Sequence, residues 1–296
     1  MTPECEFSLI PPHEIRAPAE QRIPFVFDSP HSGRYYPPGF LASSRLDEYA
    51  IRRSEDCYVD ELFGGVVALG APMLLAHFPR AYLDVNREPY ELDPRMFTEP
   101  LPPYANAQSA RVAGGLGTVP RLVGEGQDIY PGKLPLAEAL QRIETLYKPY
   151  HAVLSRLIAD TERRFGYCVL IDCHSMPAGI RAGEGIGRPD FIVGDRFGLS
   201  CSRALSETAI ELLRDMGYVV AHNKPYAGGF ITEHYGKPAK GFHALQIEVN
   251  RGLYLNERTF EKHSGFEMLR RDINMFLADL SSLPDYNFGQ PPLAAE

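Results

Sequence analysis

The sequence of 296 residues contains no tryptophan, only five cysteines, and no long run of apolar or of basic residues. Because no stretch reaches about 18 consecutive apolar residues, it offers no candidate for a membrane-spanning helix. The net charge is −8, from 30 basic and 38 acidic side chains. Nucleic-acid-binding chains are usually basic, so this balance argues against such a role. We therefore expect neither nucleic acid nor a membrane among its partners.

The cysteines are odd in number, sparsely spread and without a Cys-x-x-Cys pair. This pattern is typical of reduced thiols and argues against a disulfide framework. The N-terminal segment MTPECEFSLIPPHE lacks both the basic and the apolar part of a cleaved signal peptide. Together these features predict a cytoplasmic protein.

Glycine and proline, in contrast, are abundant. The chain has 26 of each, where average usage near 12% would give roughly 36 in total. The excess does not collapse into a low-complexity tract, so it predicts many specified turns, which is where α/β enzymes carry their sites.

Short apolar runs alternate with helical patterns along the chain. We expect strands at 23–28, 73–77, 81–86, 168–172, 191–193, 218–221 and 245–249, and helices at 58–69, 136–165, about 200–216 and 257–280. Pro149 should kink or split the second of these helices. Some predicted strands follow each other along the chain too closely for a helical crossover, so we expect strands of both directions in the sheet. The pattern predicts an α/β fold with three α/β/α layers and a central mixed, mostly parallel sheet. We expect a single domain over 1–296, with peripheral termini at about 1–20 and 284–296.

Two similar motifs follow apolar strands, DSPHSG at 28–33 and DCHSMP at 172–177. Each places a histidine, His31 or His174, where open α/β sheets bind ligands. A lone histidine is more often structural, but two in matched contexts favour a shared metal ion. Imidazole and carboxylate ligands suit zinc, and a catalytic zinc has three protein ligands.

The third ligand should be a carboxylate from the segment RRSEDCYVDELF at 52–63. Asp60 and Glu61 are explained by the preference of acids for the first turn of a helix. Glu55 and Asp56 lie at the turn before it and are the candidates. We favour Asp56, with Glu55 as the alternative.

A further carboxylate, Glu248, lies in the apolar strand ALQIEVNRG. It shares one face with Gln246 and Asn250, which would ordinarily be the solvent-exposed face. The segment resembles a central strand, however, and a partly desolvated glutamate has a raised pKa that suits a general base. We therefore predict Glu248 as the catalytic base.

Two arginines, Arg80 and Arg87, bracket the predicted strand in RAYLDVNREPYELD. A guanidinium binds a carboxylate through two parallel hydrogen bonds. Arg87 with the amide of Asn86 is thus a candidate clamp for a substrate carboxylate, although a surface ion pair with Glu88 or Glu91 would explain it equally well.

Of the two glycine-rich stretches, GGLGTVP at 114–120 lacks the strand–loop–helix context of a nucleotide site. The other, YAGGFITEHYG at 226–236, has a composition typical of a loop that closes over a small ligand, with Gly228, Gly229 and Thr232 as binding candidates. An ordinary hairpin would fit this sequence too. No Gly-x-Ser-x-Gly motif is present, and Cys173 should point away from His174, which disfavours serine and cysteine nucleophiles.

Seven motifs together resemble the N-formylglutamate amidohydrolase family: FDSPHSG, SEDCYVDELF, LDVNREPYELDP, LIDCHSMP, VGDRFG, YAGGFITEHYG and HALQIEVNRGLYL. They occur in the expected order and span roughly 23–275. The family is similar to zinc carboxypeptidases and aspartoacylases, which implies a phosphorylase/hydrolase-like fold. On this likeness one zinc ion would be held by His31, His174 and Asp56 or Glu55. The spacing His-x-x-Glu of the carboxypeptidases is absent here.

The resemblance implies hydrolysis of N-formyl-L-glutamate to formate and L-glutamate, the last step of one route of histidine degradation. Zinc would activate water, Glu248 would accept its proton, and Arg80 would help to hold the oxyanion. The partner would be a small anionic N-acyl amino acid, bound in a locally basic pocket. A related metallo-amidohydrolase or carboxypeptidase-like enzyme acting on another N-acyl amino acid or a short peptide is the first alternative. An inert ligand-binding protein of the same fold is the second.

Overall fold

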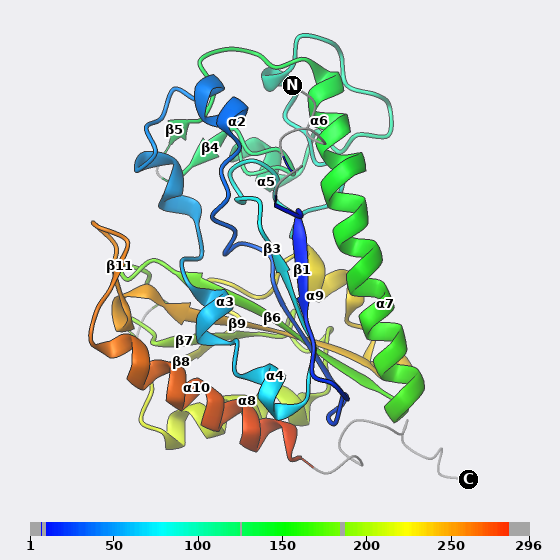
Figure 1. Ribbon diagram of the computed structural model, residues 1–296, viewed down its shortest axis with the longest axis vertical. Helices are drawn as coiled ribbons and strands as arrows, with labels where there is room; N and C mark the ends of the chain where they lie inside the picture. The colour runs from blue at the N-terminus through cyan, green and yellow to red at the C-terminus, as the bar shows by residue number, and fades with distance from the viewer. Residues whose placement is uncertain (1–6, 8–9, 125, 184–186, 284–296) are drawn as a thin grey trace. The chain divides into compact units, whose positions relative to one another are not determined.

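The computed structural model describes residues 7, 10–124, 126–183 and 187–283 (Figure 1). Its main feature is a seven-stranded sheet in the order β1-β3-β2-β6-β9-β7-β8. The strands are β1 (His13–Arg16), β2 (Phe25–Ser29), β3 (Met73–Ala76), β6 (Cys168–Met176), β7 (Phe191–Gly194), β8 (Val220–His222) and β9 (Phe242–Asn250). The predicted C-terminal peripheral segment, 284–296, and residues 1–6 of the N-terminal one lie outside the described residues.

Strand directions in this sheet are mixed. The pairs β2–β6, β6–β9 and β7–β8 are parallel, whereas β7 pairs antiparallel with β9. Every residue of β6 is buried, and so is every residue of β9 after Phe242. These two strands are buried on both faces because helices cover both, which confirms the predicted α/β fold with its central mixed sheet.

The helices that accompany the sheet are α3 (Val59–Leu62), α4 (Val66–Leu69), α8 (Arg203–Asp215), α9 (Phe230–Tyr235) and α10 (Gly265–Ser281). Helix α10 packs on α3, α4 and α8, and α8 packs on β7 and β8. Helix α9 contacts β6 and β9, and Figure 1 shows it across the sheet from α8 and α10. Helix α9 therefore covers one face of the two central strands.

By its contacts between Cα atoms the chain divides into two compact units. The first comprises the described parts of Met1–Glu14, Pro30–Asp56 and Leu75–Val153, and the second comprises those of Ile15–Ser29, Cys57–Leu74 and Leu154–Glu296. Most of the sheet belongs to the second unit. The single domain expected from the sequence stays a prediction.

The first unit contains short elements: α2 (Pro38–Ser43), α5 (Ala110–Ala113), α6 (Leu136–Arg142), the 3₁₀ turns Ala50–Ser54 and Pro94–Met96, and the hairpin of β4 (Leu122–Val123) with β5 (Gln127–Asp128). Its interior includes Arg142, which is only 1% exposed. The guanidinium lies 3.9 Å from the ring centroid of Tyr82 and donates to the hydroxyl of Tyr130 at 2.7 Å. A cation–π contact and hydrogen bonds compensate for burying this charge.

Three local expectations from the sequence were wrong. The segment 81–86 is not a strand, because Asp84 N–H bonds to Thr118 and Asn86 N–H to the Asp84 carboxylate. The helix expected at 58–69 is interrupted between α3 and α4, where Gly64 and Gly65 stand. The helix expected at 257–280 begins only at Gly265. The residues before it form turns and the short antiparallel pair of β10 (Leu255–Asn256) with β11 (Glu261–Lys262). The helix predicted at 136–165 is present as α6, a π-helical segment, Ile143–Tyr147, and α7 (Lys148–Phe165), so its α-helical pattern is interrupted just before Pro149.

The remaining short elements are the 3₁₀ turns Pro238–Lys240 and Arg251–Leu253. Among the residues that the structure describes, no helix has both the length and the hydrophobicity needed to cross a membrane.

Candidate metal and catalytic site

His31 lies two residues beyond the end of β2 and is 1% exposed. Its Nε2 atom is 2.7 Å from Oδ1 of Asp84, and its Nδ1 atom is 3.5 Å from Oδ2 of Asp56. The carboxylate of Asp84 therefore fixes the ring and leaves Nδ1 directed toward Asp56. A histidine held in this way through one nitrogen is oriented to bind a metal ion through the other.

The two candidate carboxylates of the turn, Glu55 and Asp56, have different surroundings. Glu55 accepts two hydrogen bonds from Arg52, at 2.9 and 3.1 Å, and a third from the hydroxyl of Tyr36 at 3.2 Å. Those contacts commit its carboxylate to a structural ion pair. Asp56, which is 1% exposed, has its carboxylate beside His31 instead.

His174 lies within β6, which continues to Met176 and is longer than the strand expected at 168–172. Its Nε2 atom lies 2.6 Å from Oδ1 of Asp172. Asp172 is paired in register with Asp28 of β2, so β6 lies beside the strand that leads to His31. His174 thus has Nε2 in close contact with a carboxylate, as His31 does, although Oδ1 of Asp172 makes no hydrogen bond to any residue that the structure describes.

His31, Asp56 and His174 form a buried group whose three ligand atoms all lie within 4.8 Å of one another. Two imidazoles and one carboxylate form a donor set that suits zinc in a catalytic site. The two neighbouring carboxylates make the imidazoles better ligands. The residues present therefore fit a bound divalent metal ion.

Glu248 of β9 is the register partner of His174 on β6. It is 8% exposed, and Gln246 and Asn250 are 4% and 7% exposed. The face that would ordinarily meet solvent is therefore buried, with Gly229 bonded to Gln246 and Asn250 donating to the carbonyl of Pro189. Nε2 of Gln246 donates to Oε1 of Glu248 at 2.9 Å, so the carboxylate has a fixed orientation beside the metal-binding strand.

Arg80 and Arg87 both pair with Asp84, at 3.0 and 3.5 Å. Arg87 also donates through Nε to the carbonyl of Leu116 and through Nη1 to that of Asn86. Burial lowers the pKa of Arg87 to about 10. Burial would by itself raise the pKa of Asp84, but the nearby charges, Arg87 first, outweigh it and hold that pKa well below its usual range.

The side chains of the two arginines differ in their exposure to solvent. The side chain of Arg80 is 24% exposed and that of Arg87 is 11% exposed. Arg87 is tied to the protein through all three of its nitrogens, whereas Arg80 bonds to Asp84 through Nε and Nη2. A substrate role for Arg87 stays a prediction, and the geometry gives it a structural role as well.

The segment before α9 is not a hairpin. Gly228 has φ +121°, which side-chain-bearing residues rarely adopt, and a Cβ there would lie 3.0 Å from Thr232. Gly229 donates its N–H to Oε1 of Gln246 at 2.8 Å. Thr232 is fully buried and donates to Oδ2 of Asp172 at 3.3 Å. These three residues therefore lie against the central strands that carry Asp172 and Glu248.

Reasoning from the sequence assigned no role to Asp84, Asp172, Gln246 or Arg251. The spacing of Asp172 and of Gln246 could have revealed them, since each lies two residues before a predicted site residue on a strand and so shares its face. Arg251 is 5% exposed and donates to the hydroxyl of Ser175 at 3.0 Å. Nothing in the sequence distinguishes this arginine from one on the surface.

Known proteins are similar to this chain in sequence. Residues 23–255 match the family model described as N-formylglutamate amidohydrolase. An N-formylglutamate deformylase from Pseudomonas putida is 29% identical over 239 residues, which cover 80% of this chain and 83% of that protein. The N-formylglutamate deformylase from Pseudomonas aeruginosa is 28% identical over 240 residues, which cover 80% of this chain and 84% of that protein.

Among solved structures, that of an N-formylglutamate amidohydrolase from Ralstonia eutropha JMP134 is similar over 92% of this chain and 99% of its own. The two share 35% sequence identity and superpose with a TM-score of 0.86. The match in sequence therefore extends to the fold of nearly the whole chain.

Proposed function

The chain belongs to the N-formylglutamate amidohydrolase family, and on that premise we propose that it hydrolyses N-formyl-L-glutamate to formate and L-glutamate. The observation that carries the proposal is the buried His31–Asp56–His174 group together with Glu248, which is aligned with His174 on the adjacent strand. Relatives named for this reaction support the choice of substrate.

We assign the metal to His31 and His174 through Nδ1, and to the carboxylate of Asp56. Zinc, one ion per chain, is the metal that this donor set favours. When bound, it would lower the pKa of a water molecule and polarise the formyl carbonyl. Asp84 and Asp172 would keep the two imidazoles in the tautomer that presents Nδ1 to the ion.

Glu248 has the proton-transfer role. Its Oε1 accepts the hydrogen bond from Gln246, and we assign Oε2 to take the proton of the attacking water. Oxygen then adds to the formyl carbon, the C–N bond breaks, and the same carboxyl group returns the proton to the leaving nitrogen. No proton is gained or lost over the cycle, because the amine receives the one that water gave up.

The substrate is a small dianion in a chain of net charge −8, so its carboxylates need local positive charge. Arg80 is the better placed of the two predicted arginines, since it is partly exposed. We propose that Arg80 meets the developing oxyanion or a substrate carboxylate, and that Asn86, Arg87, Gly228, Gly229 and Thr232 shape the binding pocket. A cytoplasmic enzyme of histidine degradation would be consistent with this reaction.

The decisive experiment measures formate release from a panel of N-formyl amino acids, and acetate release from the N-acetyl analogues, with and without a chelator. We expect formate from N-formyl-L-glutamate, loss of activity with chelator and recovery with zinc. Preference for an N-acetyl substrate would replace the proposal by the related amidohydrolase. No turnover of any panel member by the metal-loaded protein would favour an inert binding protein.

A further inference from the structure

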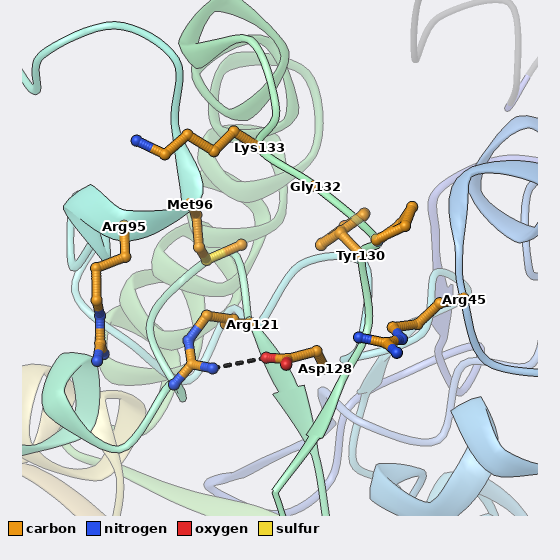
Figure 2. Close-up of a pocket in the computed structure, with 9 residues that line it drawn as sticks. Arg45, Arg95, Met96, Arg121, Asp128, Tyr130, Gly132 and Lys133 are labelled. Carbon is orange, nitrogen blue, oxygen red and sulfur yellow. Dashed lines mark hydrogen bonds and ion pairs between the residues drawn. The ribbon is translucent and has the colours of Figure 1, made fainter.

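A hollow of about 250 Å³ in the first unit is lined mainly by charged side chains (Figure 2). Four of them are cationic, and one is a carboxylate: Arg45, Arg95, Arg121, Lys133 and Asp128. We call this the basic hollow. Figure 2 shows Arg121 and Arg45 on opposite sides of Asp128, with Met96 between Arg121 and Lys133. Neither the predictions from the sequence nor the proposed reaction gives any of these residues a role.

Two of the arginines are held in place by one buried carboxylate. Asp93, which is 2% exposed, accepts from Nε and Nη2 of Arg95, the latter at 2.7 Å. It also accepts from Nε of Arg121 at 3.2 Å. Nη1 of Arg121 donates to Asp128 at 2.6 Å. The two guanidinium groups are therefore pre-organised, which lowers the entropy cost of binding a ligand.

The other two cations, Arg45 and Lys133, form no ion pair with any carboxylate that the structure describes. Among the described residues, no carboxylate lies within ion-pair distance of Arg45 or Lys133, whereas other exposed cations, such as Arg203 and Arg270, pair with a glutamate on their own helix. The two carboxylates, Asp93 and Asp128, thus compensate only part of the charge of four cations. The described lining of this hollow therefore carries more positive than negative charge, and a concentration of one sign of charge attracts small ions of the opposite sign.

We propose that the basic hollow binds a small oxyanion that carries two or more negative charges. Guanidinium groups bind phosphate and carboxylate oxygens alike through paired hydrogen bonds, and the flexible Lys133 adds a point charge. The volume admits an inorganic phosphate or a short dicarboxylate but not a nucleotide, since pockets for larger ligands exceed about 300 Å³.

The test is calorimetric titration of the wild-type protein with inorganic phosphate and, separately, with glutarate, at ionic strength held constant with sodium chloride. The double variant Arg45→Ala/Lys133→Ala removes the two cations that lack an ion pair. The control Lys240→Ala/Arg271→Ala removes two exposed cations elsewhere and changes net charge equally. We expect at least tenfold weaker binding in the first variant and wild-type affinity in the control.

Tighter binding of phosphate than of glutarate would identify a phosphate site, and the reverse order a dicarboxylate site. Equal loss in both double variants would overturn the proposal, because binding would then follow net charge alone. Undetectable binding of both anions to the wild type would overturn it too.

A different observation concerns the two strands of the catalytic site, and the inference from it rests on the proposed function. One segment, Gly228–Tyr235, contacts both strands through buried hydrogen bonds. Gly229 N–H binds Gln246, whose amide in turn donates to Glu248. Thr232 binds Asp172, whose other oxygen is 2.6 Å from His174. The segment is therefore connected, through one intermediary each, to the base and to a metal ligand.

The segment is itself firmly attached. Arg196 forms an ion pair with Glu233 at 2.6 Å and donates to the carbonyl of Gly228 at 3.4 Å. A Cβ on Gly194, the register partner of Gln246, would meet the backbone of Ala227 at 2.8 Å, so the chain lies directly on the sheet there. Such close contact leaves little freedom for Gln246.

We infer that Gln246 is a positioning residue: it transmits the placement of Gly229 to the carboxylate of Glu248. Both hydrogen bonds use its amide group, one as acceptor and one as donor. Gln246→Leu keeps the approximate volume and removes both bonds. Gln246→Glu keeps an acceptor for Gly229 but cannot donate to Glu248, beside which it places a second negative charge.

The experiment is a double-mutant cycle of Gln246→Leu with Glu248→Gln, followed by formate release and by metal analysis. Once wild-type turnover has established the proposed function, we expect Gln246→Leu to lower kcat by 10- to 100-fold with KM changed less than threefold and metal content intact. In the Glu248→Gln background the same change should have no further effect on kcat.

A multiplicative loss in the double variant, or a loss of metal in Gln246→Leu, would show a general structural role and overturn the inference. Gln246→Glu provides the matched comparison, since it should be as impaired as Gln246→Leu if donation to Glu248 is what matters. Near-wild-type activity of Gln246→Glu would likewise contradict it.

Discussion

Nε2 of His174 lies 2.6 Å from Oδ1 of Asp172, two residues earlier on the same buried strand. Side chains at this spacing share a face of the strand, so the carboxylate and the imidazole are aligned by the backbone itself. His31 makes the corresponding contact with Asp84, there as a hydrogen bond of 2.7 Å, across a sequence separation of 53 residues. Two histidines oriented by two carboxylates are the feature on which the proposed metal site depends.

Asp172→Asn should therefore weaken metal binding by about 10- to 100-fold, because the amide no longer fixes or polarises the imidazole as a carboxylate does. The affinity is measured by competition with a chromophoric chelator. Asp279→Asn, which changes an exposed aspartate of α10, is the control and should bind as the wild type does. Unaltered affinity in Asp172→Asn would separate this carboxylate from the metal.

The two arginines paired with Asp84 should respond differently to truncation. Arg87→Ala should lower the free energy of unfolding by about 3 kcal/mol or more, since it removes one partner of a buried charge pair. Arg80→Ala should change that free energy by less than about 1 kcal/mol, because its side chain is partly exposed, and should mainly raise KM. Urea unfolding and steady-state kinetics measure both effects. A stable Arg87→Ala with a raised KM would restore Arg87 as the substrate clamp.

Gly33 lies two residues after His31, and its backbone lies close to that of His77 and Phe78, which follow β3. A Cβ at this position would lie 2.1 Å from the carbonyl oxygen of Phe78 and 2.7 Å from the carbonyl carbon of His77. Backbone atoms cannot yield cheaply, so Gly33→Ala should destabilise the protein by about 1–3 kcal/mol. It should also lower metal occupancy, because His31 must shift with it.

Gly132→Ala is the matched control, since a Cβ there would meet nothing within 4 Å. Thermal unfolding and metal analysis of the two variants provide the comparison. Wild-type stability of Gly33→Ala would contradict the close approach.

The thiols Cys57, Cys168, Cys173 and Cys201 are buried and form no disulfide. Burial raises the pKa of Cys168, Cys173 and Cys201. A raised pKa reduces the fraction of reactive thiolate at a given pH. A disulfide reagent at pH 8 should therefore label at most one thiol per native chain, Cys5 being outside the described residues, and all five after denaturation. Rapid labelling of two or more native thiols would contradict this.

Much of the fold could be predicted from the sequence because its signals are local. The apolar runs that became β2, β6, β7 and β9 were found, since a strand buried on both faces is a continuous apolar stretch. The segment 81–86 has the same apolar character, yet its N–H groups bond within loops. Periodicity cannot show where backbone hydrogen bonds go.

The candidate site divides in the same way. The prediction of His31, His174 and Glu248 follows from residue type and from position after or within strands, and that of Asp56, with Glu55 as the alternative, from its place in the turn before a helix. The sequence does not reveal three other contacts of the site: Glu55 with Arg52, Arg80 and Arg87 with Asp84, and Gly229 with Gln246. Each of these contacts depends on how distant parts of the chain pack together, which local spacing does not show.

The sequence by itself determined the donor types, the order of the motifs and the alternation of strands and helices, because these depend on chemistry and on short-range spacing. Only the tertiary structure decided which carboxylate contacts which histidine and that the Gln246–Glu248 face is buried rather than open to solvent. The physical reason is that hydrogen bonds and burial depend on distances between atoms far apart in the chain, and those distances are set by the packing of the whole fold.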